Sequence, residues 1–139
     1  MGEDEWRTFV MEGTRTGKLA TVRRDGSASV VPIWFVLDDD GTFVFTTGSE
    51  SAKAKAMRRD PRVALLVDDQ RPPFGFVLAR GEVTLSNDLD EMLRWATRIG
   101  GRYMGEERAE EYGRRNAVPE ESLVRLVPRT VIAQADIAD

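Results

Sequence analysis

The stretch KLATVRRDGSASVVPIWFVL spans residues 18–37 and has the pattern of two strands joined by a tight turn. Residues 18–23 and 27–37 are rich in β-branched and aromatic side chains, which favour extended backbone. Asp25-Gly26 lies between them, and Asp-Gly is a dipeptide typical of hairpin connections. The stretch therefore predicts a β-hairpin and, with it, an antiparallel sheet.

Further β-rich runs follow this hairpin along the chain. We expect strands at residues 42–47 and 62–67, one or two strands within 74–86, and terminal strands at 123–127 and 131–135 that are interrupted at Pro128. Short polar turns separate most of these runs. Five to seven strands of this length favour a closed or nearly closed barrel.

Four segments around these strands have helical patterns. The expected helices cover residues 4–14, 51–59, 87–99 and 106–115. Glu50 or Ser51 would cap the second of them, and Gly100-Gly101 would close the third. The chain is therefore expected to form one α+β domain over residues 1–139, with an antiparallel sheet and flanking helices.

The composition excludes several classes of chemistry. The 139 residues contain no cysteine and no histidine. A disulfide framework, a thiolate nucleophile, a Ser-His-Asp triad and a histidine base are therefore excluded. We expect no metal site, and redox chemistry would have to come from a bound cofactor.

The charge and hydropathy patterns limit the classes of partner that this chain is expected to have. The formal net charge is −4, so no nucleic-acid partner is indicated. No run of about 18 apolar residues is present, so we expect no membrane span. The acidic start, Met1 to Glu5, lacks an apolar signal segment, which favours a cytoplasmic protein.

The segment Thr46 to Arg59 has the pattern of an anion site. It places hydroxyl side chains and a Gly48 turn ahead of a helix start, followed by four cations. Helix N-termini with free N–H groups favour phosphate, and lysine adds a point charge. The alternative is an ordinary capped helix with a solvated basic face.

A proline inside the second run of the hairpin indicates a strand edge or a ligand-facing position. Pro32 lacks the N–H that a central strand needs, so nearby backbone groups are free to meet the polar rim of a planar ring. Trp34 and Phe35 are expected to point to opposite faces. The alternative is a core strand that carries an edge proline.

The loop Asp68 to Phe74 is the third candidate. Its paired prolines stiffen the chain and present Phe74 beside it, although a rigid surface turn explains the same residues. Asp68 and Asp69 are adjacent on a strand and should face opposite sides, which argues against a shared metal or acid site.

The ordered set of these motifs resembles the pyridoxamine-phosphate-oxidase-like split-barrel flavoproteins, and more narrowly the branch that uses the deazaflavin coenzyme F420. The likeness rests on six runs and covers residues 6–133. These runs are KLATVR (18–23), DG (25–26), VPIWF (31–35), FTTG (45–48), SAKAK (51–55) and RRDPRVAL (58–65). The runs DDQRPPF (68–74), RYMG (102–105) and EEYGRRN (110–116) look like the F420 branch.

The resemblance implies a six-stranded antiparallel split barrel and a homodimer with two sites in its interface. It implies cofactor-binding roles for twelve residues. Val31, Pro32, Ile33 and Trp34 would line the ring, Thr46 and Thr47 would contact the ring or its ribityl chain, and Ser51, Lys53 and Lys55 would hold the phosphate, while Arg59 would stabilise the anionic tail and Pro73 and Phe74 would approach the site. FMN-binding relatives tend to carry arginine where Ala52 and Ser27 stand here, which speaks against a pyridoxamine-phosphate oxidase.

The expected function is an F420-dependent reductase that passes a hydride from reduced deazaflavin to an electron-poor double bond of a small, conjugated substrate. No catalytic side chain is identified, and a proton could come from water, Tyr103 or arginine-bound solvent. The alternatives are an FMN-dependent oxidase or reductase, a non-catalytic F420 carrier, and a small-molecule-binding barrel without a redox cofactor.

Overall fold

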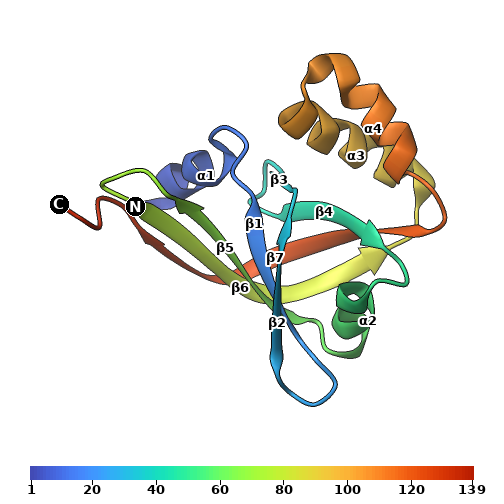
Figure 1. The fold of residues 1–139 in the computed structure, drawn as a ribbon, viewed down its shortest axis with the longest axis horizontal. Helices are drawn as coiled ribbons and strands as arrows, with labels where there is room; N and C mark the ends of the chain where they lie inside the picture. The colour runs from blue at the N-terminus through green and yellow to red at the C-terminus, as the bar shows by residue number, and fades with distance from the viewer.

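The computed structural model describes residues 1–139 as one curled antiparallel sheet with helices at its ends (Figure 1). The strands are β1 (Gly17–Val22), β2 (Ala28–Ile33), β3 (Val36–Leu37), β4 (Phe43–Gly48), β5 (Arg62–Asp69), β6 (Gly75–Ser86) and β7 (Glu121–Gln134). The helices are α1 (Glu3–Met11), α2 (Ala52–Arg59), α3 (Leu89–Met104) and α4 (Ala109–Asn116), with a 3₁₀ turn η1 at Glu106–Arg108. The strand order is β2-β1-β5-β6-β7-β4-β3.

The expected hairpin is confirmed. β1 pairs with β2 in antiparallel register from Gly17 opposite Ile33 to Val22 opposite Ala28. The Asp25 carboxylate accepts hydrogen bonds from the backbone N–H and hydroxyl of Ser27, which stabilises the turn. The long β run expected up to residue 37 divides, however, because two residues outside the ladder separate β2 from β3. The sheet therefore has seven strands, where six were expected, and β3 is only two residues long.

The expected interruption at Pro128 is wrong, because β7 runs unbroken for 14 residues. It pairs with β4 and also with β6, which is itself one strand. Pro128 lies opposite Gly81, where the register of β6 and β7 shifts. The shift leaves Arg129 out of the ladder, and this local break in the pairing accommodates a proline, which has no N–H to donate.

The expected end of α3 at Gly100-Gly101 is also wrong, because α3 continues to Met104 and stops at Gly105, whose φ is +96°. Both inner glycines are packing positions. A Cβ on Gly100 would lie 2.6 Å from the Tyr112 Cβ, and one on Gly101 would lie 2.8 Å from a Glu106 carboxylate oxygen. Glycine here allows α4 and η1 to approach α3 closely.

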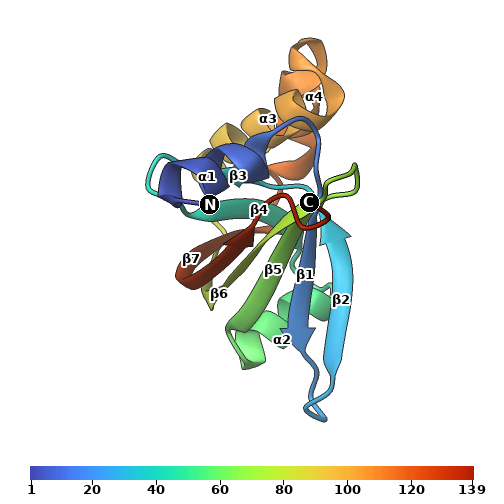
Figure 2. The same cartoon turned by 90° about the vertical axis from the view of Figure 1, so that its left-hand side faces the viewer.

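Two apolar clusters hold the helices on the sheet. The larger has 17 buried residues and includes Trp6 of α1, Phe35 and Phe43. In Figure 2, α1 lies over one end of the curled sheet. The smaller includes Val44, Trp95 and Leu123 and packs α3 on β3, β4 and β7. The α3–α4 pair therefore sits at the end of the sheet where β4 finishes and β7 begins (Figure 1). None of the helices is long and apolar enough to cross a bilayer.

The close approach of β6 and β7 gives a stability prediction. A Cβ on Gly81 would overlap the backbone carbonyl oxygen of Val127, and backbone cannot move aside as a side chain can. We expect Gly81→Ala to lower the free energy of unfolding by about 1–3 kcal/mol, as overpacking generally does. Urea unfolding would measure this. The matched control is Gly2→Ala, since a Cβ at Gly2 meets nothing within 4 Å, and equal loss in both variants would contradict the prediction.

Candidate functional site

A pocket of about 410 Å³ lies between the end of β2, the end of β4 and the α3–α4 pair, and we call it the β2–β4 pocket. Its lining is mixed, with apolar walls and several hydroxyl, amide and carboxyl groups. The residues are Thr16, Pro32, Ile33, Trp34, Thr46, Thr47, Gly48, Ile99, Asn116 and Glu121. Five of the twelve residues with expected cofactor roles, at positions 32–34 and 46–47, are therefore brought together here.

The start of α2 adjoins this pocket through hydrogen-bonded side chains. The hydroxyls of Thr47 and Ser51 are 3.0 Å apart, and the Ser51 oxygen accepts from the backbone N–H of Ala54 at 3.1 Å. Ser51 is thus the N-cap, as one of the two expected alternatives had it. The first N–H groups of a helix have no acceptor within the helix, so this end attracts anions.

Lys53 adds an unpaired cation at the same end. Its side chain is half-buried and forms no salt bridge, whereas Lys55 is exposed and lies 3.6 Å from Glu50. The positive charge of Lys53 also acts on Glu121, which lines the pocket. Ser51 and Lys53 do not line the pocket, but they lie next to two of its polar residues, Thr47 and Glu121.

Four further residues with expected cofactor roles lie away from the pocket in a single chain. Arg59 donates to the carbonyl of Val22 at 3.3 Å, and Val31 pairs with Leu19 and packs against the larger core. Pro73 and Phe74 lie at the opposite end of the sheet, where they accept hydrogen bonds from the C-terminal tail. Their cofactor roles, and that of Lys55, stay predictions.

Glu121 is the pocket residue of greatest chemical interest that sequence reasoning missed. Burial raises the pKa of its carboxyl group, and the positive charges of Lys53 and Arg115 act in the opposite direction. Its side chain forms no hydrogen bond or salt bridge within the chain, which leaves it available to a ligand. Thr16 and Ile99 were missed as well, because their segments carry no motif. Asn116 ends the run 110–116 that resembles the F420 branch, but the resemblance gave it no role.

Tyr103 is held in place by backbone groups behind the pocket. Its hydroxyl donates to the Arg15 carbonyl at 2.8 Å and accepts from the Phe35 N–H at 3.2 Å. Burial raises the pKa of this phenol, so its proton is both engaged and tightly held. This geometry argues against Tyr103 as the proton donor.

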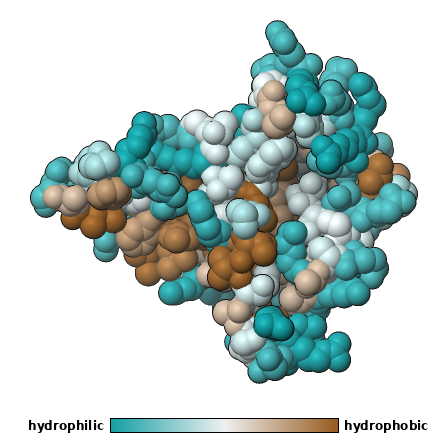
Figure 3. Space-filling view, in the orientation of Figure 1, coloured by the Kyte–Doolittle hydropathy of each residue, from teal (hydrophilic) through white to brown (hydrophobic).

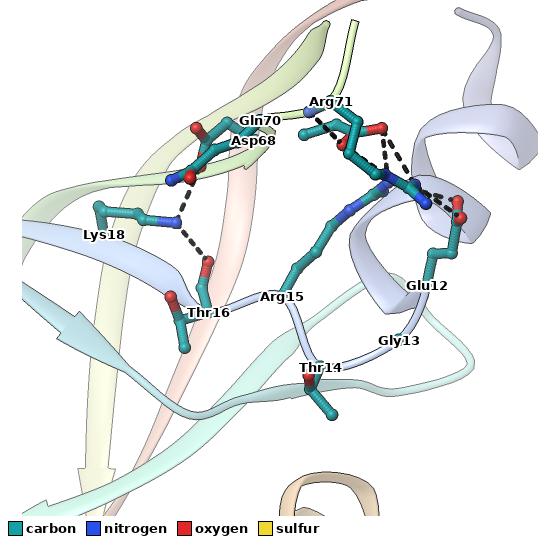
Figure 4. A pocket seen from close by; sticks show the side chains of 10 residues that line it. Glu12, Gly13, Thr14, Arg15, Thr16, Lys18, Asp68, Gln70 and Arg71 are labelled. Atoms are coloured by element: carbon teal, nitrogen blue, oxygen red, sulfur yellow. Dashed lines mark hydrogen bonds and ion pairs between the residues drawn. The ribbon is translucent and has the colours of Figure 1, made fainter.

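A second pocket, of about 450 Å³, lies beside the α1–β1 loop and is lined only by glycine and polar residues (Figure 4). Its three cations and three carboxylates pair with one another. The pairs are Lys18–Asp68 at 2.8 Å, Arg15–Asp69 at 3.0 Å, Arg71–Asp69 at 3.0 Å, Arg71–Glu12 at 3.3 Å and Arg15–Glu12 at 3.5 Å. Hydrogen bonds from Arg71 lower the pKa of Asp69 to about 2. Because these charges already have partners, the β2–β4 pocket is the better candidate site.

Fold and pocket together define a split-barrel protein, and comparison with known families gives the same class. The model of the pyridoxamine 5'-phosphate oxidase family matches residues 3–135. The chain belongs to this family. Comparison with curated proteins found no match.

Solved structures with the same fold extend this assignment. The chain is similar to the conserved hypothetical protein Rv2991 from Mycobacterium tuberculosis, with 28% identity over 98% of this chain and 86% of that one and a TM-score of 0.86. It is also similar to an F420 reductase, with 25% identity over 90% and 94% of the two chains and a TM-score of 0.70. The haem storage protein HutZ from Vibrio cholerae shares the fold at 18% identity over 94% and 92%, with a TM-score of 0.71.

The raised pKa of Glu121 gives a prediction about pH. The Glu121 carboxyl group binds its proton more tightly in the folded chain than in the unfolded chain. The free energy of unfolding therefore falls as pH rises from the unfolded pKa of Glu121 through its folded pKa. We expect Glu121→Gln to melt at a higher temperature than the parent at pH 7, with the difference shrinking as pH falls toward 4. Thermal unfolding followed by circular dichroism would measure both. Glu120→Gln, at the exposed neighbour, is the control, and an unchanged or lower melting temperature in Glu121→Gln at pH 7 would contradict the argument.

Proposed function

We propose that this chain is an F420-dependent oxidoreductase that transfers a hydride from reduced deazaflavin to an electron-poor double bond of a small, conjugated substrate. The observation that carries the proposal is Lys53, a half-buried cation without a salt bridge in the first turn of the Ser51-capped helix α2. This turn lies next to the β2–β4 pocket, because Ser51 contacts Thr47 and the charge of Lys53 acts on Glu121. The likeness to an F420 reductase supports it.

The residues present fit such a cofactor. One end of the pocket offers hydroxyl donors, a helix N-terminus and an ammonium group, which suit a phosphodiester. The other end offers the apolar surfaces of Pro32, Ile33 and Trp34, which suit a planar ring. When bound, the deazaflavin supplies the hydride.

The chain's own residues would bind, orient and shield the reacting groups. Lys53 and Ser51 would hold the phosphate, and the hydroxyls of Thr46 and Thr47 would hold the ribityl chain or the ring edge. Ile99 and Trp34 would exclude water from the reacting face, which strengthens polar interactions there. The unpaired Glu121 carboxyl could accept a hydrogen bond from a ligand hydroxyl or N–H group.

An FMN-dependent oxidase or reductase is the second candidate, and the family description favours it. Ser51 and Lys53 would suit either phosphate, so the donor set alone does not separate the two cofactors. The third candidate is a carrier that binds F420 without turnover, which the absence of histidine and cysteine would permit. Likeness to HutZ speaks for the fold alone.

We also propose a homodimer. Apolar side chains gather on one face of the molecule, over the strands at the left of the view and over β2 (Figure 3). Val30 on β2, Val127 and Ile132 on β7, and Phe74 are all more than two-fifths exposed. Exposed apolar surface of this extent is typical of a protein interface. A second copy could then bring Phe74 toward a site that one chain leaves open.

The anion site predicts a loss of cofactor affinity when Lys53 is removed. We expect Lys53→Ala to weaken binding of F420 about tenfold to a hundredfold, since a charge-assisted hydrogen bond contributes about 1.5–3 kcal/mol. Parallel fluorescence titrations of the apo-protein with F420 and FMN would measure this and rank the two cofactors.

Arg24→Ala is the matched control, because it also removes one positive charge but lies in the exposed β1–β2 turn. Unchanged F420 affinity in Lys53→Ala would remove Lys53 from the site. A parent protein that binds FMN and not F420 would support the second candidate, and one that binds neither would refute the cofactor proposal.

The homodimer is tested by the mass of the protein in solution. We expect sedimentation equilibrium to give twice the 15.6 kDa of one chain, and titration to give one cofactor per chain. A protein that stays at the mass of one chain at tens of micromolar would refute the dimer, whether or not a cofactor binds.

A further inference from the structure

An aromatic wall behind the β2–β4 pocket has no role in holding a phosphate or a ribityl chain. Trp34 lies in the two-residue link between β2 and β3, and its ring stacks on Tyr103 with the centroids 5.1 Å apart and the planes 6° apart. Tyr112 of α4 packs against the same indole, with its centroid 6.0 Å away and its plane tilted by 59°. Two rings from the helical pair thus support one indole from the sheet.

The support extends behind Tyr103 to a half-buried cation. The Arg102 guanidinium carbon lies 4.8 Å from the centroid of Tyr103 and 4.7 Å from that of Phe35. The Tyr103 hydroxyl is hydrogen-bonded to the backbone of the link at Phe35 and to that of the α1–β1 loop at Arg15. This ring therefore has little freedom to rotate, and the indole that stacks on it is held in one plane.

Trp34 is nevertheless 38% exposed and lines the pocket, in a chain whose other two tryptophans are each 8% exposed. A large apolar ring that is held in place by neighbouring rings and is still more than a third exposed loses little conformational freedom when a further ring stacks on it. Phe35, the next residue, is fully buried, so the two side chains point to opposite faces as expected.

We propose that Trp34 is a stacking platform for a planar conjugated ring that enters the β2–β4 pocket, and that Tyr103 is the residue that positions it. The ring is that of the cofactor or that of the acceptor substrate. The identity of the ring, as that of the cofactor or of the substrate, rests on the proposed function. The assignment of Trp34 as a platform rests on the geometry of the aromatic wall alone.

Binding of two fluorescent planar probes tests the platform. Lumiflavin carries the cofactor's ring type without ribityl chain or phosphate, and 7-hydroxycoumarin carries a conjugated, electron-poor double bond. We expect Trp34→Leu to weaken binding of one of them about tenfold. Trp34→Phe keeps an aromatic face and should bind within about threefold of the parent, but with brighter emission of the bound ring, because indole quenches a stacked fluorophore and a phenyl ring does not.

The two probes separate the sources of the ring. Loss of lumiflavin affinity assigns the platform to the cofactor ring. Loss of 7-hydroxycoumarin affinity in cofactor-loaded protein, with lumiflavin unaffected, assigns it to the acceptor. Parental affinity and parental emission for both probes in both Trp34 variants overturn the proposal, and Trp34→Phe decides the matter where Trp34→Leu does not fold.

Tyr103 variants test the positioning role. Tyr103→Phe keeps the stacked ring and should retain parental quenching, whereas Tyr103→Leu removes it and should follow Trp34→Leu in affinity and emission. Equal behaviour of the two variants refutes positioning through the ring. Leu93→Ala is the control, because Leu93 is 42% exposed on α3 and does not line the pocket.

The outcomes separate this inference from the proposed function. A parent protein that binds neither F420 nor FMN refutes the redox proposal alone, and Trp34-dependent binding of a planar probe would still stand. A parent that binds F420 through Lys53, with Trp34 variants unchanged for both probes, keeps the redox proposal and refutes the platform.

Discussion

Arg102 donates hydrogen bonds to the carbonyl oxygens of Val10, Gly13 and Phe35 at 2.8, 3.0 and 2.7 Å. These acceptors belong to α1, to the α1–β1 loop and to the link between β2 and β3, while Arg102 itself lies on α3. Burial lowers the pKa of this guanidinium, which nevertheless stays charged because arginine is so strong a base. A charge removed from water must be satisfied locally, so these four segments are held in one arrangement. The pocket walls at Trp34 and Ile99 depend on that arrangement.

The opposite end of the pocket depends on a shorter chain of contacts. β4 is followed closely by α2. The contact between the hydroxyls of Thr47 and Ser51 joins the end of strand β4 to the N-cap of helix α2. The first cation of α2 is thereby placed beside the start of β7, where Glu121 lies. One end of the site is therefore built by neighbours in sequence, and the other by segments up to about 90 residues apart.

This difference explains what could be predicted from the sequence. Ser51 and Lys53 belong to a local motif, in which hydroxyl, turn and helix start follow one another, so their proximity could be inferred. The β1–β2 hairpin has an equally local signal in Asp25-Gly26. Glu121 and Thr16 join the pocket only through tertiary contacts, which leave no pattern in either segment.

The wrong predictions have a common physical origin. Gly100-Gly101 was interpreted as a helix end from backbone preference, although the glycines serve the close packing of α4 and η1 on α3. Pro128 was interpreted as a break in a strand, although a register shift accommodates it. Glycine and proline restrict or relax the backbone locally. Whether a helix or strand ends at such a residue depends on the element that packs or pairs with it.

The shift between β6 and β7 divides the longest ladder of the sheet into two stretches whose registers differ by one residue. The first stretch of β7 runs from Glu121, which lines the pocket, to Pro128. The second stretch runs from Thr130 to Gln134. A slip of one residue normally turns every side chain of a strand to the other face. Here the unpaired residue at the bulge can absorb such a slip. The C-terminal stretch is therefore free to gain or lose a residue during evolution while the geometry of the pocket is preserved.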